Sequence, residues 1–182
     1  MAVIVALVIA AAVATAVWVV PPLRGTGGGS FSSAPAVPER PDDAFALTVD
    51  RVVDGDTLRA SVLVPNEVVT TDDSIRIRLI GIDTPELTPA VKCGADPARA
   101  HLQSLLPDGA RVWASIDRDP WDRYDRRLFL LWTDDGTFVN HDLVAAGHAV
   151  AMPVRPNLAY ADLFAAAEDE ARASNRGRWG SC

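Results

Sequence analysis

The chain has 182 residues, a formal charge of −7 at pH 7 and an apolar fraction of 49%. This length allows one folded domain with appendages and a sizeable buried core. With 24 acidic and 17 basic residues, the composition excludes binding to nucleic acid through a broad basic surface. Any such contact has to come from a few local arginines or from a bound cation.

The N-terminal stretch 2–20 contains no charged side chain. As a helix it would be about 28 Å long, close to the roughly 30 Å hydrocarbon core of a bilayer. We therefore expect residues 1–20 to form a transmembrane anchor or a signal helix. The length favours an uncleaved anchor, because the apolar part of a signal peptide usually has ~7–15 residues. A cleaved signal, with a small-residue site at 14–16, and a buried core helix are the alternatives.

A linker is predicted at residues 21–43. The run 27–30 is Gly-Gly-Gly-Ser, and prolines follow it at positions 35, 38 and 41. Gly and Ser keep such a segment flexible, and scattered Pro keeps it extended. Residues 44–182 then form the predicted catalytic domain.

Alternation of apolar and polar residues predicts five strands in this domain. They cover residues 45–53, 58–64, 74–80, 111–116 and 127–132. Asp54-Gly55 predicts a hairpin turn between the first two.

Three helices are predicted by their capping signals. The first runs to about residue 106 after an Asp96 cap, the second ends at Ala146 after an Asn140 cap, and the third covers 158–174 after an Asn157 cap. Strands followed by segregated helices indicate an α+β fold. Five short strands with turn signals favour a closed β-barrel of the OB type.

The stretch 76–86, R-I-R-L-I-G-I-D-T-P-E, is the first of the segments that carry chemistry. It begins as a strand that contains Arg78 and then turns at a glycine and a proline, so Asp83 and Glu86 lie on the turn. Asp56 adds a carboxylate after another predicted strand. Carboxylates on turns suit a hard cation, and a neighbouring arginine suits bidentate phosphate binding. The pattern predicts metal-assisted chemistry on a phosphodiester.

Three blocks together resemble the thermonuclease family, the staphylococcal-nuclease-like domains. They are V-D-G-D-T at 53–57, R-L-I-G-I-D-T-P-E at 78–86 and D-R-Y-D-R at 122–126. Weaker agreement extends the resemblance over about residues 45–179. The resemblance implies a five-stranded OB barrel with three helices, and Ca²⁺-dependent hydrolysis of DNA and RNA phosphodiesters that leaves 3′-phosphates.

The same resemblance implies a role for each site residue. Asp56 and Asp83 would be carboxylate ligands of Ca²⁺, and Thr84 would offer its backbone carbonyl. Glu86 would orient or deprotonate the attacking water. Two arginines, Arg78 and Arg126, would stabilise the transition state, and two further residues would bind substrate, namely Arg123 and Tyr124.

This chain departs from the family pattern at three positions. Asp125 stands where the family often has glycine, and its charge next to Arg126 opposes phosphate binding. Aspartate nevertheless tolerates a left-handed turn better than most residues. Met152 and Val154 stand where well-studied members have tyrosines that stack on the base.

A catalytically silent OB module that binds nucleic acid or protein at the cell surface is the alternative. Such a module would be expected to lose at least one of the residues that the resemblance marks as essential, and all are present, so we favour the enzyme. We expect a monomer whose catalytic domain lies outside the cell, held at the membrane or secreted after cleavage.

The chain has two cysteines, Cys93 and Cys182. An even number behind an export-like segment permits one disulfide. It would tie the C-terminal end to the loop after the active-site turn. Two free thiols are the alternative.

Overall fold

The structure is a computed structural model that describes residues 35–182. The expected anchor or signal helix at 1–20, and most of the expected linker, lie outside the described residues. Between residues 35 and 182, no helix combines the length and the apolar character that crossing a bilayer requires. Residues 35–40 form no helix or strand, but the Pro38 carbonyl accepts a hydrogen bond from Trp132 Nε1 at 3.4 Å.

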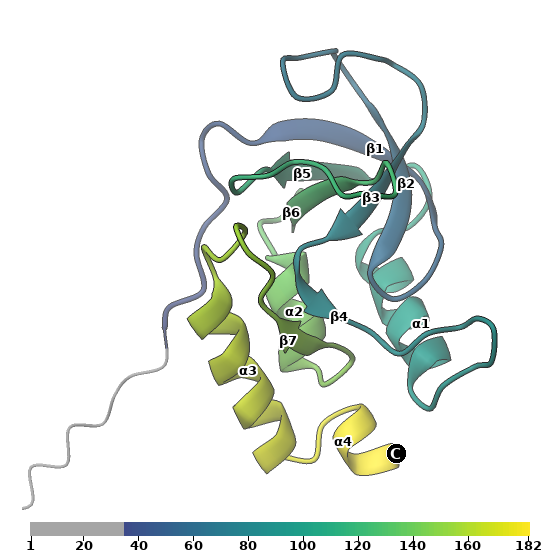
Figure 1. Ribbon diagram of the computed structural model, residues 1–182, viewed down its shortest axis with the longest axis vertical. Helices are drawn as coiled ribbons and strands as arrows, with labels where there is room; N and C mark the ends of the chain where they lie inside the picture. The colour runs from purple at the N-terminus through teal and green to yellow at the C-terminus, as the bar shows by residue number, and fades with distance from the viewer. Residues whose placement is uncertain (1–34) are drawn as a thin grey trace, which may run out of the picture. The chain divides into compact units, whose positions relative to one another are not determined.

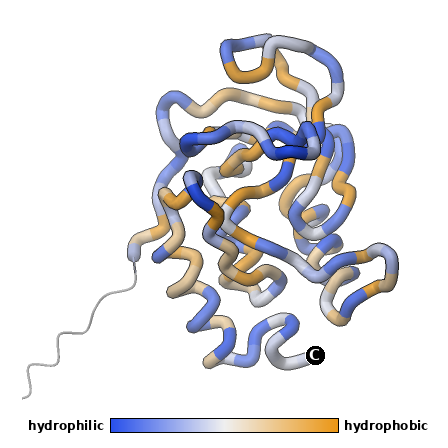
Figure 2. The backbone as a smooth tube through the Cα atoms, viewed as in Figure 1, coloured by the Kyte–Doolittle hydropathy of each residue, from blue (hydrophilic) through white to orange (hydrophobic). Residues whose placement is uncertain are grey.

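Five strands close into a barrel, as predicted (Figure 1). Around the barrel they follow the order β1 (Phe45–Val52), β2 (Thr57–Val62), β3 (Ile75–Leu79), β6 (Arg127–Thr133) and β5 (Arg111–Ser115). Neighbours are antiparallel except β3 and β6, which run parallel. Apolar and polar residues alternate along β2 and β3, whereas β6 is apolar from Leu128 to Trp132. Figure 2 shows the hydropathy along the chain. The inward side chains are fully buried, among them Leu47, Leu58, Ile77, Leu79 and Phe129.

A second, two-stranded sheet joins β4 (Gly81–Asp83) to β7 (Val150–Met152). Neither strand was predicted, because three residues are too few to show a period of two. Gly81 begins β4 with φ +78°, and a Cβ there would come within 2.4 Å of the Phe164 ring. Only glycine fits this conformation and this space. The chain therefore leaves the barrel after β3 and carries Asp83 to the second sheet.

Three helices of seven residues or more are present in the described part, in agreement with the prediction. They are α1 (Ala95–Leu105), α2 (Val139–Ala145) and α3 (Ala161–Ala173). They lie on one side of the barrel in Figure 1, with the four-residue α4 (Arg178–Ser181) at the C-terminus. The helix α4 was not predicted, because one turn shows no apolar periodicity.

The predicted helix caps were wrong. The N-cap residues are Gly94, Phe138 and Tyr160, and none of them makes a side-chain cap hydrogen bond. Asp96 lies inside the first turn of α1. The two asparagines that were expected to cap helices instead bond to backbone groups far along the chain, which local sequence signals do not reveal.

Asn140 is fully buried and joins two parts of the barrel. Its Oδ1 accepts from the Leu131 amide at 3.0 Å, and its Nδ2 donates to the Ile80 carbonyl at 2.9 Å. Asn157 joins two loops in the same way. Its Oδ1 accepts from the Arg118 and Asp119 amides at 2.9 and 2.8 Å. These two side chains satisfy backbone groups that the strands leave unpaired.

Cys93 and Cys182 form a disulfide, and their Cα atoms are 5.9 Å apart. The bond joins the loop before α1 to the last residue of the chain, as the sequence allowed.

Candidate active site

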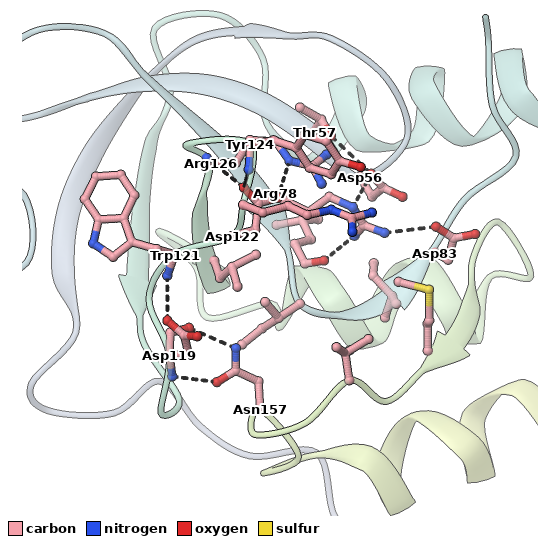
Figure 3. Close-up of a pocket in the computed structure, with 18 of the residues that line it drawn as sticks. Asp56, Thr57, Arg78, Asp83, Asp119, Trp121, Asp122, Tyr124, Arg126 and Asn157 are labelled. Carbon is pink, nitrogen blue, oxygen red and sulfur yellow. Dashed lines mark hydrogen bonds and ion pairs between the residues drawn. The ribbon is translucent and has the colours of Figure 1, made fainter.

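A cavity of about 540 Å³ opens where β2, β3 and β4 meet the segments 119–126 and 152–157 (Figure 3). Of the eight residues that the sequence marked for catalysis, metal or substrate, seven line it: Asp56, Arg78, Asp83, Glu86, Arg123, Tyr124 and Arg126. The eighth, Thr84, does not line the cavity, but its amide donates a hydrogen bond to Asp56. The structure therefore gathers segments that lie up to 70 positions apart, from 56 to 126, into one site.

Strand pairing brings these segments together. Thr57 pairs with Arg78 across the antiparallel β2 and β3, so Asp56 lies beside that arginine. The Leu79 amide donates to the Asp56 carbonyl at 2.9 Å. Arg78 also pairs with Leu128 across the parallel β3 and β6, which places Arg126 at the same edge of the barrel.

Arg78 is the centre of the charged wall. Its side chain is buried between two carboxylates: Nε is 3.0 Å from Asp56 Oδ1, and Nη2 is 2.9 Å from Asp83 Oδ1 (Figure 3). Its Nη1 donates to the Leu79 carbonyl. Since one guanidinium contacts both carboxylates, the two acidic groups predicted as metal ligands lie close to each other.

Asp56 is buried and fully hydrogen-bonded. Its Oδ2 accepts from the Thr84 amide and from Thr84 Oγ1, both at 2.9 Å. Burial raises the pKa of Asp56 to about 6, and the charge of Asp54 adds to this, although Arg78 and Thr84 act in the opposite direction. Gly55 makes this approach possible, because a Cβ there would be 2.7 Å from Thr84 Oγ1. A buried carboxylate with a raised pKa gains from an additional positive charge nearby.

The donors at this wall fit a hard divalent cation. Asp56 and Asp83 offer carboxylate oxygens, and Thr84, the next residue after Asp83 in the sequence, offers a backbone carbonyl. Within residues 35–182, no group of three or more His, Cys, Asp or Glu side chains is arranged to hold a metal ion. A cation here would therefore have two carboxylates and would fill its remaining positions with water and substrate oxygens, as Ca²⁺ and Mg²⁺ sites often do.

Arg126 is oriented by Asp122. The Arg126 Nε lies 2.7 Å from Asp122 Oδ2, and the Arg126 amide donates to Asp122 Oδ1 at 2.9 Å. Burial acts to raise the pKa of Asp122, but hydrogen bonds from Arg126 and Tyr124 lower it below its ordinary value, so the carboxylate stays ionised. No role was predicted for Asp122. Its position four residues before Arg126 could have indicated an ion pair between the two side chains.

The loop that holds Arg126 also presents an aromatic edge. Tyr124 is 58% exposed, and the Arg123 guanidinium carbon lies 4.8 Å from its ring centroid. Asp125 has φ +60°, so it adopts the left-handed conformation that glycine would take. The departure from the family pattern is thus accommodated by the backbone.

Glu86 lines the cavity from an exposed position on the segment after β4. Met152 and Val154 line it from β7 and the residues that follow. They are 37% and 55% exposed and offer no aromatic ring to a base. Trp121, which the sequence analysis did not single out, also lines the cavity.

The fold is a closed barrel of the OB type, and the cavity at its wall holds carboxylate and guanidinium groups side by side, which suits a charged substrate. Comparison with known proteins identifies the family. The family model described as staphylococcal nuclease homologue matches residues 76–181. The chain therefore belongs to the staphylococcal nuclease family, and it is a nuclease.

Three relatives illustrate this similarity. A thermonuclease of Staphylococcus intermedius is 33% identical over 139 residues, which cover 72% of this chain and 74% of the relative. The SPbeta prophage-derived endonuclease YokF of Bacillus subtilis (strain 168) is 32% identical over 73% of this chain and 43% of its own length. Endonuclease YhcR of the same organism is 29% identical over 78% of this chain but only 12% of its own length.

The raised pKa of Asp56 predicts how stability depends on pH in metal-free protein. In the folded state the group keeps its proton up to a pKa of about 6, whereas in the unfolded chain it loses the proton near its ordinary pKa of 3.8. The folded state thus holds more protons between these values, so the group's contribution to the free energy of unfolding falls as pH rises from about 4 to 7. The decrease, relative to Asp56→Asn, is expected to be on the order of 1–3 kcal/mol.

Denaturant unfolding of both proteins at several pH values, in the presence of a chelator, measures this difference. Parallel pH profiles of the two proteins would show that the buried carboxyl titrates at its ordinary pKa.

Proposed function

We propose that this nuclease is Ca²⁺-dependent and hydrolyses phosphodiester bonds of DNA and RNA, leaving 3′-phosphates. One observation carries the proposal. A buried arginine bridges two carboxylates at 3.0 and 2.9 Å on the wall of a cavity that also contains Glu86 and Arg126. This arrangement offers, side by side, oxygen donors for a cation, cationic groups for a phosphate and a carboxylate for a proton.

The metal would be held by Asp56, Asp83 and the Thr84 carbonyl. When bound, the cation supplies a positive charge that polarises a phosphoryl oxygen. The all-oxygen donor set supports a hard cation, and the small number of protein carboxylates supports a loosely held one.

Glu86 is the proposed general base. Its carboxylate accepts a proton from the attacking water as the water oxygen bonds to phosphorus. The bond from phosphorus to the 5′-oxygen breaks, and that oxygen takes a proton from solvent and leaves as a 5′-hydroxyl. The 3′-side keeps the phosphate. A positioned carboxylate of this kind typically contributes about 10²–10⁴-fold to the rate.

Arg78 and Arg126 would stabilise the negative charge that grows on the phosphoryl oxygens. Both are held before substrate arrives: Arg78 by Asp56 and Asp83, and Arg126 by Asp122. Donors that are already oriented need no reorganisation during the reaction, and this is the source of much electrostatic catalysis.

The cavity rim supports hydrolysis with little preference among bases. Arg123 and Tyr124 form an exposed cationic and aromatic edge that would contact a neighbouring nucleotide. Met152 and Val154 provide an apolar wall with no side-chain hydrogen-bonding group. Contacts of this kind discriminate weakly between bases, because they do not distinguish their polar edges.

A silent binding module would need none of the reactive groups in this arrangement. The family assignment makes the chain a nuclease and not such a module. Activity of the purified domain on DNA that is abolished by a chelator and restored by Ca²⁺ tests the proposed metal dependence, and full activity in the presence of the chelator would contradict it.

Glu86→Gln is expected to fold like the parent protein and to lose 10²-fold or more in kcat, because the substitution keeps the side-chain shape and removes the basic oxygen. The exposed side chain is not part of the core, so circular dichroism and thermal unfolding should be unchanged. Initial rates on DNA measure the loss. A cost below about 10-fold would be too small for a general base.

Arg126→Ala is expected to lower kcat by about 10²–10³-fold, the range found for removal of one stabilising donor. Arg127→Ala is the matched control. Its guanidinium is buried against Trp121, 3.2 Å from the ring centroid, so this change should mainly reduce stability. Rates measured well below the unfolding temperature of each variant separate the two effects, and an equal loss of kcat in both would contradict the assignment.

We also propose that the enzyme works outside the cell, either anchored or released. A site with two carboxylates is expected to bind Ca²⁺ with a Kd on the order of 10⁻⁴–10⁻³ M, as extracellular modules do. Cytosolic Ca²⁺ would leave it empty, whereas millimolar Ca²⁺ would fill it. Half-maximal activity at sub-micromolar Ca²⁺ would remove this argument, and a domain that protease reaches only after cell lysis would exclude an outward-facing location.

A further inference from the structure

The segment that carries Glu86 is weakly attached to the rest of the protein. Between β4 and α1, residues 84–94 form no helix or strand, and residues 88–93 are all exposed. Its first two residues, Thr84 and Pro85, are buried, and Thr84 is held by Asp56, but Glu86 makes no side-chain hydrogen bond or ion pair with any described residue. The side chain of the proposed general base thus has no polar partner of its own, and the chain that follows it is exposed.

The C-terminal helix α4, in contrast, is firmly anchored. The Arg178 amide donates to the Gly147 carbonyl at 3.0 Å, and the Arg172 guanidinium of α3 lies 4.1 Å from the Trp179 ring centroid. Gly177 is so close to Gly147 that a Cβ on it would be 2.5 Å from the Gly147 carbonyl oxygen. The last turn of the chain is therefore fixed to α2 and α3.

The disulfide joins the weakly attached segment to this anchor. Cys93 bonds to Cys182, the residue after α4, and the two segments lie side by side in Figure 1. One residue before Cys93, the Lys92 amide donates to the Glu86 carbonyl at 2.9 Å. A continuous connection of one covalent bond and one hydrogen bond thus runs from the anchored C-terminus to the backbone of Glu86.

We propose that the Cys93–Cys182 disulfide positions Glu86, so that the nuclease is fully active when oxidised and attenuated when a dithiol reduces it. This inference rests on the proposed role of Glu86. Reduction takes two electrons and two protons from the dithiol, which becomes a cyclic disulfide, and leaves two thiols on the protein. Both cysteines are exposed, so a reductant can reach the bond. The loop then loses its covalent tie, while Arg78 and Arg126 keep their partners.

Kinetics of the full chain before and after treatment with dithiothreitol test the proposal. We expect kcat on DNA to fall roughly 5- to 50-fold, because displacing a reacting group by about 1 Å can cost up to 10²-fold. KM should change less than twofold, since the substrate-binding arginines lie on β3 and on the loop before β6. Reoxidation should restore the parent protein, and the double variant Cys93→Ser, Cys182→Ser should match the reduced parent under both conditions.

Combination with Glu86→Gln distinguishes positioning of Glu86 from general loosening. If the disulfide acts through Glu86, reduction has no further effect on the residual rate of that variant, because coupled residues are not additive. An equal fold-loss in both backgrounds would overturn the proposal.

Hydrogen exchange tests the coupling independently of activity. On reduction, exchange in the peptide 86–93, which includes the Lys92 amide, should accelerate while exchange in β3 stays the same. Unchanged exchange in this peptide would overturn the coupling, even in a protein whose proposed nuclease chemistry is correct. Accelerated exchange in a protein that shows no Ca²⁺-dependent hydrolysis would instead reject the proposed function.

Discussion

The buried guanidinium of Arg78 is the interaction on which the arrangement of the site depends. It is 8% exposed and has a carboxylate on each side. A buried charge is tolerated only when its partners are well placed, and removing one partner of such a pair typically costs about 3–5 kcal/mol. The turn before β2, the strand β3 and the short strand β4 must therefore keep their relative positions. Two glycines allow this: Gly55 lets the turn approach Thr84, and Gly81 takes the chain out of the barrel.

The same constraint explains the chemistry. A wall that alternates carboxylates and guanidinium groups attracts a cation and a phosphate to adjacent positions, and each group is held before either arrives. Asp122 extends this principle to Arg126, which lines the cavity, by accepting a hydrogen bond from its Nε. The rest of the cavity lining includes Met152, Val154 and Tyr124, whose side chains offer mainly apolar or aromatic surface and few hydrogen-bonding groups.

The reactive groups differ in how they are supported. Arg78, Asp56 and Asp83 lie on or next to paired strands, whereas Glu86 lies on an exposed segment whose second support comes from the far end of the chain. The charged part of the barrel wall is therefore held by strand pairing. The position of Glu86 depends on a link between residues that are 89 positions apart.

The sequence by itself determined the five strands and the three longer helices, because alternation and turn residues are local properties. The residues that meet in the cavity were marked by the resemblance to the thermonuclease family, which rests on the three sequence blocks at 53–57, 78–86 and 122–126. The sequence also indicated that Asp125 tolerates a left-handed turn, which its φ of +60° confirms. The tertiary structure alone decided the role of Asn140 and Asn157, which were expected to cap helices and instead bond to distant backbone groups. It also decided the β4–β7 sheet and the bridging position of Arg78, and it shows Cys93 and Cys182 as a disulfide and not as two free thiols. These features depend on contacts between residues that are far apart in the chain, and no local pattern encodes which distant groups will satisfy a buried charge or an unpaired backbone amide.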